Sequence, residues 1–152
     1  MTQSAIRVGV TAESGHGLPA TLTESLDRLE AEGVDTVELP FLWLELVANG
    51  RVIPERLREL KAVTAHRPFT YSAHAAIGIN FTSEPHYLDL HMNLAKAHLD
   101  LAAEVGAEHM VVHTGYFPTS MTAGQIAGLY EQQRRCLAEL GDLARDRNVI
   151  VV

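Results

Sequence analysis

Two histidines follow apolar segments whose residue types are typical of β-strands. His74 ends the β-prone run in "YSAHAAIGINF", residues 71–81, and His113 closes the valine run in "HMVVHTGYF", residues 109–117. A neutral imidazole can bind a borderline metal ion such as zinc, contact a substrate or transfer a proton. Because both histidines hold the same place relative to a predicted strand, we expect them to share one site.

Carboxylates end the polar face of two earlier predicted strands, as the histidines end the polar face of the later two. Successive residues of a strand point to opposite faces, and in each of the four segments one face is mainly apolar and suited to packing against helices. The other face carries small or polar residues and ends in Glu13, Glu38, His74 and His113. If these second faces all point inward, the four ionisable groups converge.

The elements that must position these groups alternate along the chain. Strands are predicted over residues 6–13, 35–40, 68–75, 109–115 and 148–152. Helices are predicted over residues 22–33, 54–66, 88–106 and 122–147, with a short helical segment at 42–50. Gly33 and Gly106 suit helix C-termini, and Thr122 with Gln125 fits a capping box. Uninterrupted strand–helix alternation predicts parallel strands with helical crossovers.

Two α/β architectures fit this alternation: an open doubly wound sheet, or part of a TIM (β/α)8 barrel. The phosphate-binding pattern G-x-G-x-x-G does not follow the first strand, which continues as "TAESGHGLP". The polar strand faces favour the barrel, since barrel enzymes place their chemistry at the C-terminal mouth. We therefore predict one domain over residues 1–152 with about four and a half βα units of such a barrel.

Composition narrows the choice of partners. The 152 residues are 47% hydrophobic and 20% charged, and the formal net charge of −7 disfavours nucleic acid, whose binding depends on Lys and Arg. No apolar run approaches the roughly 20 residues needed to span a membrane, and the N-terminus lacks a secretory layout. The lone Cys136 suits packing in a helix and a reducing compartment, so a cytoplasmic location is expected.

The two histidine segments also carry a family resemblance. The chain resembles the endonuclease IV and xylose isomerase-like group of TIM barrels in the segment "HAAIGINF", the long helix after it and the segment "GAEHMVVHTG". The segment "DTVELP" supports this resemblance more weakly. That group contains metal-dependent sugar phosphate isomerases and epimerases as well as apurinic-site endonucleases. In the endonuclease branch the histidines of His-Ala-Pro-Tyr-x-Ile-Asn and His-Pro-Gly segments bind zinc. By motif, these ligands fall on His74 and His113.

Departures from the endonuclease pattern bear on function. Ala76 and Ile77 stand where that branch has Pro and Tyr, and Thr114 replaces the Pro after the second histidine. In the endonuclease branch the aromatic residue near the first histidine helps to engage distorted DNA. Its absence here makes an endonuclease function less favoured. In the isomerase and epimerase branch, Glu, Asp, His and Glu from the fifth strand onward hold the metal. The resemblance thus implies the N-terminal half of a barrel, with most ligands of a zinc, manganese or magnesium ion beyond Val152.

Three functions follow as hypotheses. The first is a metal-dependent isomerase or epimerase of a small sugar or hydroxy-carbonyl compound, with this part of the chain inactive by itself. The second is an apurinic-site endonuclease that uses a zinc cluster. The third is a non-catalytic half barrel that self-associates through its open edges, because unpaired strand edges invite pairing.

The roles of individual residues stay open between two or more interpretations. His74 and His113 suit metal binding, contact with a substrate or with a residue that binds the metal, or plain packing at the mouth. Glu38 could orient a substrate hydroxyl or a ligand histidine, or form a structural salt bridge. Glu13 and His16 could line the mouth or belong to a solvated loop. The remaining candidates are substrate contacts at Asn80 and Tyr116, whereas surface or strand-base positions are expected for His66, His86, His91, His98 and His109; no catalytic residue is assigned.

Overall fold

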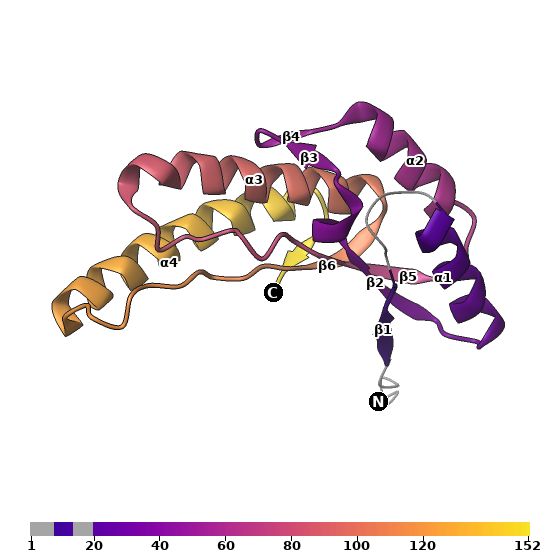
Figure 1. Cartoon of the computed structure of the whole chain (residues 1–152), viewed down its shortest axis with the longest axis horizontal. Coiled ribbons are helices and arrows are strands. Elements are labelled where there is room, and N and C mark those ends of the chain that lie inside the picture. The colour runs from indigo at the N-terminus through magenta and orange to yellow at the C-terminus, as the bar shows by residue number, and fades with distance from the viewer. Residues whose placement is uncertain (1–7, 14–19) are drawn as a thin grey trace.

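The computed structural model describes residues 8–13 and 20–152 (Figure 1). Five strands form one sheet in the order β1 (Gly9–Thr11), β2 (Thr36–Pro40), β5 (Thr70–His74), β6 (Ala107–Val111) and β7 (Ile150–Val151). All of its neighbouring strands are parallel. The helices are α1 (Ala20–Ala31), α2 (Pro54–Thr64), α3 (Pro85–Glu104) and α4 (Ala123–Arg145). Each strand is added beside its predecessor in the sheet, which confirms the predicted α/β fold of parallel βα units.

One face of the sheet packs against the helices and forms the core. Val37 and Leu39 of β2 are fully buried, as is Ala73 of β5. The alternate residues of the same strands, such as Glu38 and Ser72, are only half-buried. Leucines of α1 and small and apolar residues of α3 complete the core on the helical side. The division between an apolar face and a polar face predicted for these strands is therefore present. For the first strand the same prediction is wrong, because Val8 and Val10 are 75% and 43% exposed.

A β-bulge interrupts the pairing of β5 with β6, the two strands that lead to His74 and His113. Tyr71 pairs with Ala107, but the next residue of β5, Ser72, pairs with His109. Glu108 is thus an extra residue in β6, and alternation restarts beyond it. Because of this restart, Met110 and Val112 are buried, whereas His113 is exposed.

The predicted helical segment at residues 42–50 is wrong beyond its first turn. A 3-10 helix, η1 (Phe41–Leu44), is followed by an antiparallel hairpin of β3 (Val47–Ala48) and β4 (Arg51–Val52). Asn49 and Gly50 form its two-residue turn with φ values of 51° and 69°. Asn-Gly is the preferred dipeptide for a hairpin turn in which both residues have positive φ.

The predicted helix ends are confirmed where the chain gave a local signal. Thr122 and Gln125 form a reciprocal capping box at the start of α4. Gly33 and Gly106 adopt φ values of 76° and 70°, the left-handed conformation that follows α1 and α3. Within residues 8–13 and 20–152, we find no helix that is both long enough and apolar enough to cross a membrane.

His98 is buried inside the fold, which corrects the expected surface position. Only 3% of its surface is exposed, on the side of α3 that packs into the core. Its Nδ1 lies 2.8 Å from the carbonyl oxygen of Leu94, and its ring centroid lies 6.0 Å from that of Phe41. Burial lowers the pKa of His98, so the folded state favours the neutral ring.

We expect acid to destabilise the protein partly through His98. A histidine whose pKa is lowered by folding stabilises the native state above the unfolded value of about 6.5, and this contribution is lost as the pH falls below it. The loss approaches about 1.4 kcal/mol per pH unit between the unfolded and folded pKa values. Urea denaturation from about pH 8 to about pH 5 should show a shallower pH dependence for His98→Asn, which cannot titrate.

A matched control for this variant is His66→Asn. His66 is exposed and has a φ of 63°, a conformation that Asn tolerates. His66→Asn should retain the wild-type pH dependence of unfolding. Identical pH profiles for wild type and His98→Asn would contradict the expected role of His98.

Candidate functional site

Four polar side chains form a continuous row across four neighbouring strands. The Thr11 hydroxyl donates to Glu38 Oε1 at 3.0 Å, and His74 Nδ1 lies 3.1 Å from the same oxygen. His74 Nε2 in turn lies 2.9 Å from His113 Nε2. We call Thr11, Glu38, His74 and His113 the polar row. It joins three of the four ionisable residues that the sequence predicted to converge.

The register of the sheet explains why these side chains meet. Thr11 pairs directly with Glu38. Glu38 pairs with Ser72, so His74 lies two residues farther along β5 on the same face. His74 pairs with Val111, and His113 follows two residues beyond that position. The row therefore runs diagonally across the sheet toward the carboxyl ends of the strands, where barrel enzymes place their chemistry.

The row is accessible on the side of the sheet away from the helices. The side chains of Glu38 and His74 are 23% and 32% exposed, and His113 is exposed. The two imidazole rings are stacked, with centroids 5.1 Å apart and planes inclined by 23°. A small polar molecule can therefore reach the carboxylate and both rings from solvent.

The facing nitrogens of the two rings suit a shared proton or a shared cation. Two bare lone pairs 2.9 Å apart would repel, so a positive centre between them stabilises the contact. Imidazole nitrogens bind zinc at about 2.0–2.1 Å, which brings both Nε2 atoms within reach of one ion. In the part of the chain that the structure describes, no three His, Cys, Asp or Glu side chains are grouped as a metal site. The donor atoms of His74 and His113 thus fit two ligands of a metal ion.

Glu13 does not join the polar row. Its carboxylate lies 3.2 Å from the guanidinium of Arg28 on α1. Its backbone N–H also donates to the hydroxyl of Ser25, at 2.9 Å. These contacts direct Glu13 toward α1, because a nearby arginine offers it a stronger partner than the open face. His16, predicted to line the mouth with Glu13, lies outside the described residues.

Asn80 is buried and connects the loops that follow β5 and β6. Its side-chain oxygen accepts hydrogen bonds from the hydroxyl and backbone N–H of Thr82 and from the backbone N–H of Tyr116. Its side-chain nitrogen donates to the carbonyl oxygen of Tyr116 at 3.2 Å. The Tyr116 side chain is 72% exposed and makes none of these bonds. Asn80 therefore shapes the site by fixing loops, and Tyr116 remains available for a ligand.

Two glutamines of α4 hold the same loops, and sequence reasoning missed both. Gln132 donates from its amide to the carbonyl oxygens of Phe81 and Ser83, each at 2.9 Å. Gln133 donates to the carbonyl oxygen of Thr114 at 2.8 Å, directly after His113. Polar residues on a helix resemble a solvated face in the sequence, so no local signal could reveal these contacts.

The other histidines lie apart from the row's hydrogen bonds. His91 accepts a hydrogen bond at Nδ1 from the backbone N–H of Asn80. His86 lies 3.5 Å from a carboxylate oxygen of Glu84 at the exposed start of α3. His109 lies on β6 and pairs with Ser72, so it is on the same face as His113 but deeper in the sheet.

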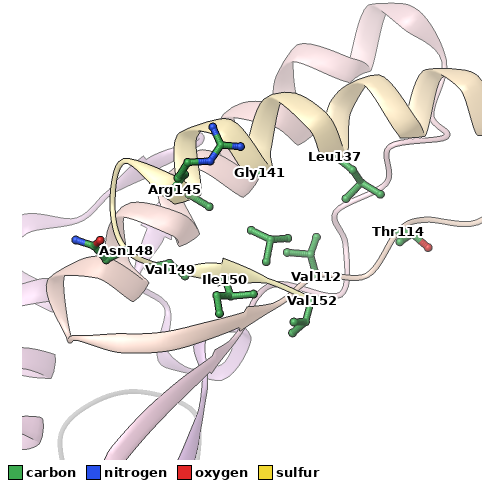
Figure 2. A pocket seen from close by; sticks show the side chains of 11 residues that line it. Val112, Thr114, Leu137, Gly141, Arg145, Asn148, Val149, Ile150 and Val152 are labelled. Carbon is green, nitrogen blue, oxygen red and sulfur yellow. The ribbon is translucent and has the colours of Figure 1, made fainter.

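A pocket of 680 Å³ lies elsewhere, between α4 and β7, the last strand of the sheet (Figure 2). Its lining includes Val112, Leu137 and Val152, with Arg145 and Asn148 at one end. No member of the polar row lines it. Its largely apolar walls lack the convergent polar groups of a typical catalytic site.

Gly115 is the backbone position on which the loop after β6 depends. Its φ is 115°, and a Cβ there would collide with the side-chain oxygen of Asn80. We expect Gly115→Ala to destabilise the protein by about 1–3 kcal/mol, because strain and a displaced amide add together. Urea denaturation provides the measurement.

Gly128 offers a matched control for this substitution. It lies within α4, and a Cβ there would meet nothing within 4 Å. Gly128→Ala should stabilise the protein by up to about 1 kcal/mol, as expected in a helix. If Gly115→Ala were as stable as wild type, the proposed dependence of the loop on Gly115 would be incorrect.

Comparison with known proteins agrees with this geometry. A family model described as "Xylose isomerase-like TIM barrel" matches residues 26–152. The chain belongs to the xylose isomerase-like TIM barrel family. A search of curated protein sequences gives no match.

Solved structures of sugar epimerases have the same fold. A D-tagatose 3-epimerase-like protein matches with a TM-score of 0.71 and 19% identity, over 96% of this chain and 51% of its own. A D-psicose 3-epimerase from Clostridium cellulolyticum H10, solved with D-tagatose, gives a TM-score of 0.73 and 15% identity, with the same coverage. An L-ribulose 3-epimerase gives 0.67 and 15%, over 97% and 48%. The chain therefore spans about half the length of these proteins.

Proposed function

We propose that this chain forms the N-terminal half of the substrate pocket of a metal-dependent isomerase or epimerase. The substrate class would be a small sugar or another hydroxy-carbonyl compound. The polar row carries this proposal, because it places a carboxylate and two imidazoles together at the carboxyl ends of parallel strands. The similarity in fold to sugar 3-epimerases supports the substrate class.

In this proposal His74 and His113 hold a divalent cation through their facing Nε2 atoms. When bound, such an ion polarises a carbonyl and the neighbouring hydroxyl of the substrate, which makes the intervening C–H bond more acidic. Zinc, manganese and magnesium are the candidates, and imidazole ligands favour zinc over the other two, which prefer oxygen ligands. Further ligands would have to come from outside the polar row.

Glu38 and Tyr116 would contact the substrate. Among the residues that the structure describes, both hydrogen bonds of the Glu38 carboxylate use Oε1, so Oε2 can accept a hydrogen bond from a substrate hydroxyl. Tyr116 follows β6 and exposes its ring and hydroxyl to solvent. Glu13 and Asn80 are left out of the proposed pocket, because Arg28 and the loop backbone engage their side chains. The carboxylate that moves the substrate proton would come from later strands, as the family resemblance implies.

We expect metal-dependent turnover from the polypeptide that the complete reading frame encodes. A panel of ketopentoses and ketohexoses would be assayed with and without Mn²⁺, Zn²⁺ or Mg²⁺ and after chelation. Substituting His74→Gln or His113→Gln should reduce kcat/KM by more than about 100-fold, because each would remove a metal ligand. Absence of turnover on the whole panel, with no bound metal, would count heavily against the proposal.

Two comparisons make this assay specific. His66→Gln changes an exposed histidine outside the row and should leave turnover unchanged. Abasic duplex DNA at low salt tests the endonuclease hypothesis, which predicts salt-sensitive binding.

The coding sequence past Val152 offers a separate check of the proposal. A Glu-Asn pair followed by βα units that carry Asp, His and Glu would supply the expected remaining ligands.

A further inference from the structure

We infer that Glu38 is a positioning residue that fixes the tautomer and orientation of His74. The inference deepens the proposed function and rests on it for its consequence, because it concerns which ring nitrogen faces the ligand. It rests on the order of the contacts in the polar row: hydroxyl, carboxylate, imidazole, imidazole.

The donor and acceptor chemistry of the row allows one assignment for neutral rings. An ionised carboxylate only accepts hydrogen bonds, so the contact of 3.1 Å requires a hydrogen on His74 Nδ1. A neutral imidazole carries one hydrogen, and therefore His74 Nε2 presents a lone pair. This lone pair points at His113 Nε2, 2.9 Å away, which must then be the donor. One carboxylate thus sets the hydrogen positions of both imidazoles.

The Glu38 side chain is itself held in place. Its neighbours in β2, Val37 and Leu39, are fully buried, which fixes the backbone from which the carboxylate projects. The Thr11 hydroxyl donates to the same oxygen that faces His74. Glu38 is 23% exposed at its side chain, so water screens its bond to the imidazole less than it would on an open surface.

The carboxylates of Glu13 and Glu38 have different charged partners. The partner of Glu13 is the Arg28 guanidinium, at 3.2 Å. Among the residues that the structure describes, the ion pairs of Glu38 include His74 and no Lys or Arg. The charge of Glu38 is therefore directed at the imidazole, and its hydrogen bond gains strength from that charge.

This arrangement gives the two histidines different parts in ligand binding. His74 already presents its Nε2 lone pair and is ready to bind a cation or to accept a hydrogen from a substrate hydroxyl. His113 carries its hydrogen on Nε2 and must move it to Nδ1 before it can do the same. Carboxylates that orient a metal-bound histidine typically contribute 10–100-fold to metal affinity. Glu38 should contribute to affinity by this amount through His74.

Nitrogen NMR tests the inference without any substrate. Long-range ¹H–¹⁵N spectra of the metal-free protein at about pH 8, above the ordinary histidine pKa of about 6.5, report which ring nitrogen carries the hydrogen. His74→Gln and His113→Gln assign the signals. Wild type should show His74 protonated at Nδ1 and His113 protonated at Nε2. Glu38→Ala should convert His74 to the mixture of tautomers of an unrestrained ring.

Three further variants separate positioning from a general structural effect. Glu38→Gln keeps an acceptor without the charge and should partly retain the Nδ1–H form. Thr11→Val removes only the supporting hydroxyl and should give a smaller change than Glu38→Ala. The matched control Glu13→Gln removes a carboxylate that is paired with Arg28, and it should leave the His74 signals unchanged.

A Zn²⁺ titration followed by the same ring signals distinguishes the two proposals. Weaker binding by 10–100-fold in Glu38→Ala supports both. No response of either ring to Zn²⁺, with the tautomer change intact, overturns the metal role and supports the positioning role. The same His74 tautomer in wild type and in a folded Glu38→Ala variant overturns the inference, whatever the zinc result.

Discussion

The site depends on one constraint: each strand must give one face to the helices. Because residues alternate, burial of Val37 and Leu39 sends Glu38 to the opposite face, and burial of Ala73 sends His74 there as well. Parallel pairing then brings these side chains to the same edge of the sheet. Apart from the β-bulge at Glu108 of β6, the polar row needs no special local conformation in its strands. It follows from core packing on the far side of the same backbone.

The sequence was sufficient for the features that depend on local pattern. The order of the parallel strands and their helices, the buried faces of β2 and β5 and the capping box of α4 were all predicted, and the structure confirms them. The meeting of His74 and His113 was predicted from the same alternation, together with the parallel order of the strands. The hairpin after η1 also had a local signal, the Asn49–Gly50 dipeptide, but the apolar residues around it were interpreted as helical. Substrate and metal remain proposals, because neither is a property of the strand pattern.

Features that depend on side-chain partners far along the chain could not be predicted. Glu13 lies two residues beyond Thr11, which pairs with Glu38, and was predicted to share the face of Glu38, yet its carboxylate pairs with Arg28 of α1. Asn80 resembled a ligand contact because it is a polar residue in a loop, but its partners are Thr82, two residues away, and the backbone of Tyr116, 36 residues away. The burial of His98 depends on how α3 lies against Phe41, which the spacing of residues within α3 alone does not reveal.

The bulge at Glu108 has a consequence for how such a chain can change over time. Beyond it, every side chain of β6 faces opposite to where uninterrupted counting from Ala107 would put it. If Glu108 paired opposite Ser72 without a bulge, the His113 imidazole would turn toward the helices and Met110 would face the solvent side. Deletion of Glu108 itself would leave a regular strand with the same faces, whereas deletion of one residue between His109 and His113 would turn His113 to the buried side. We therefore expect lineages to keep the stretch from His109 to His113 at a fixed length even where its residue types drift.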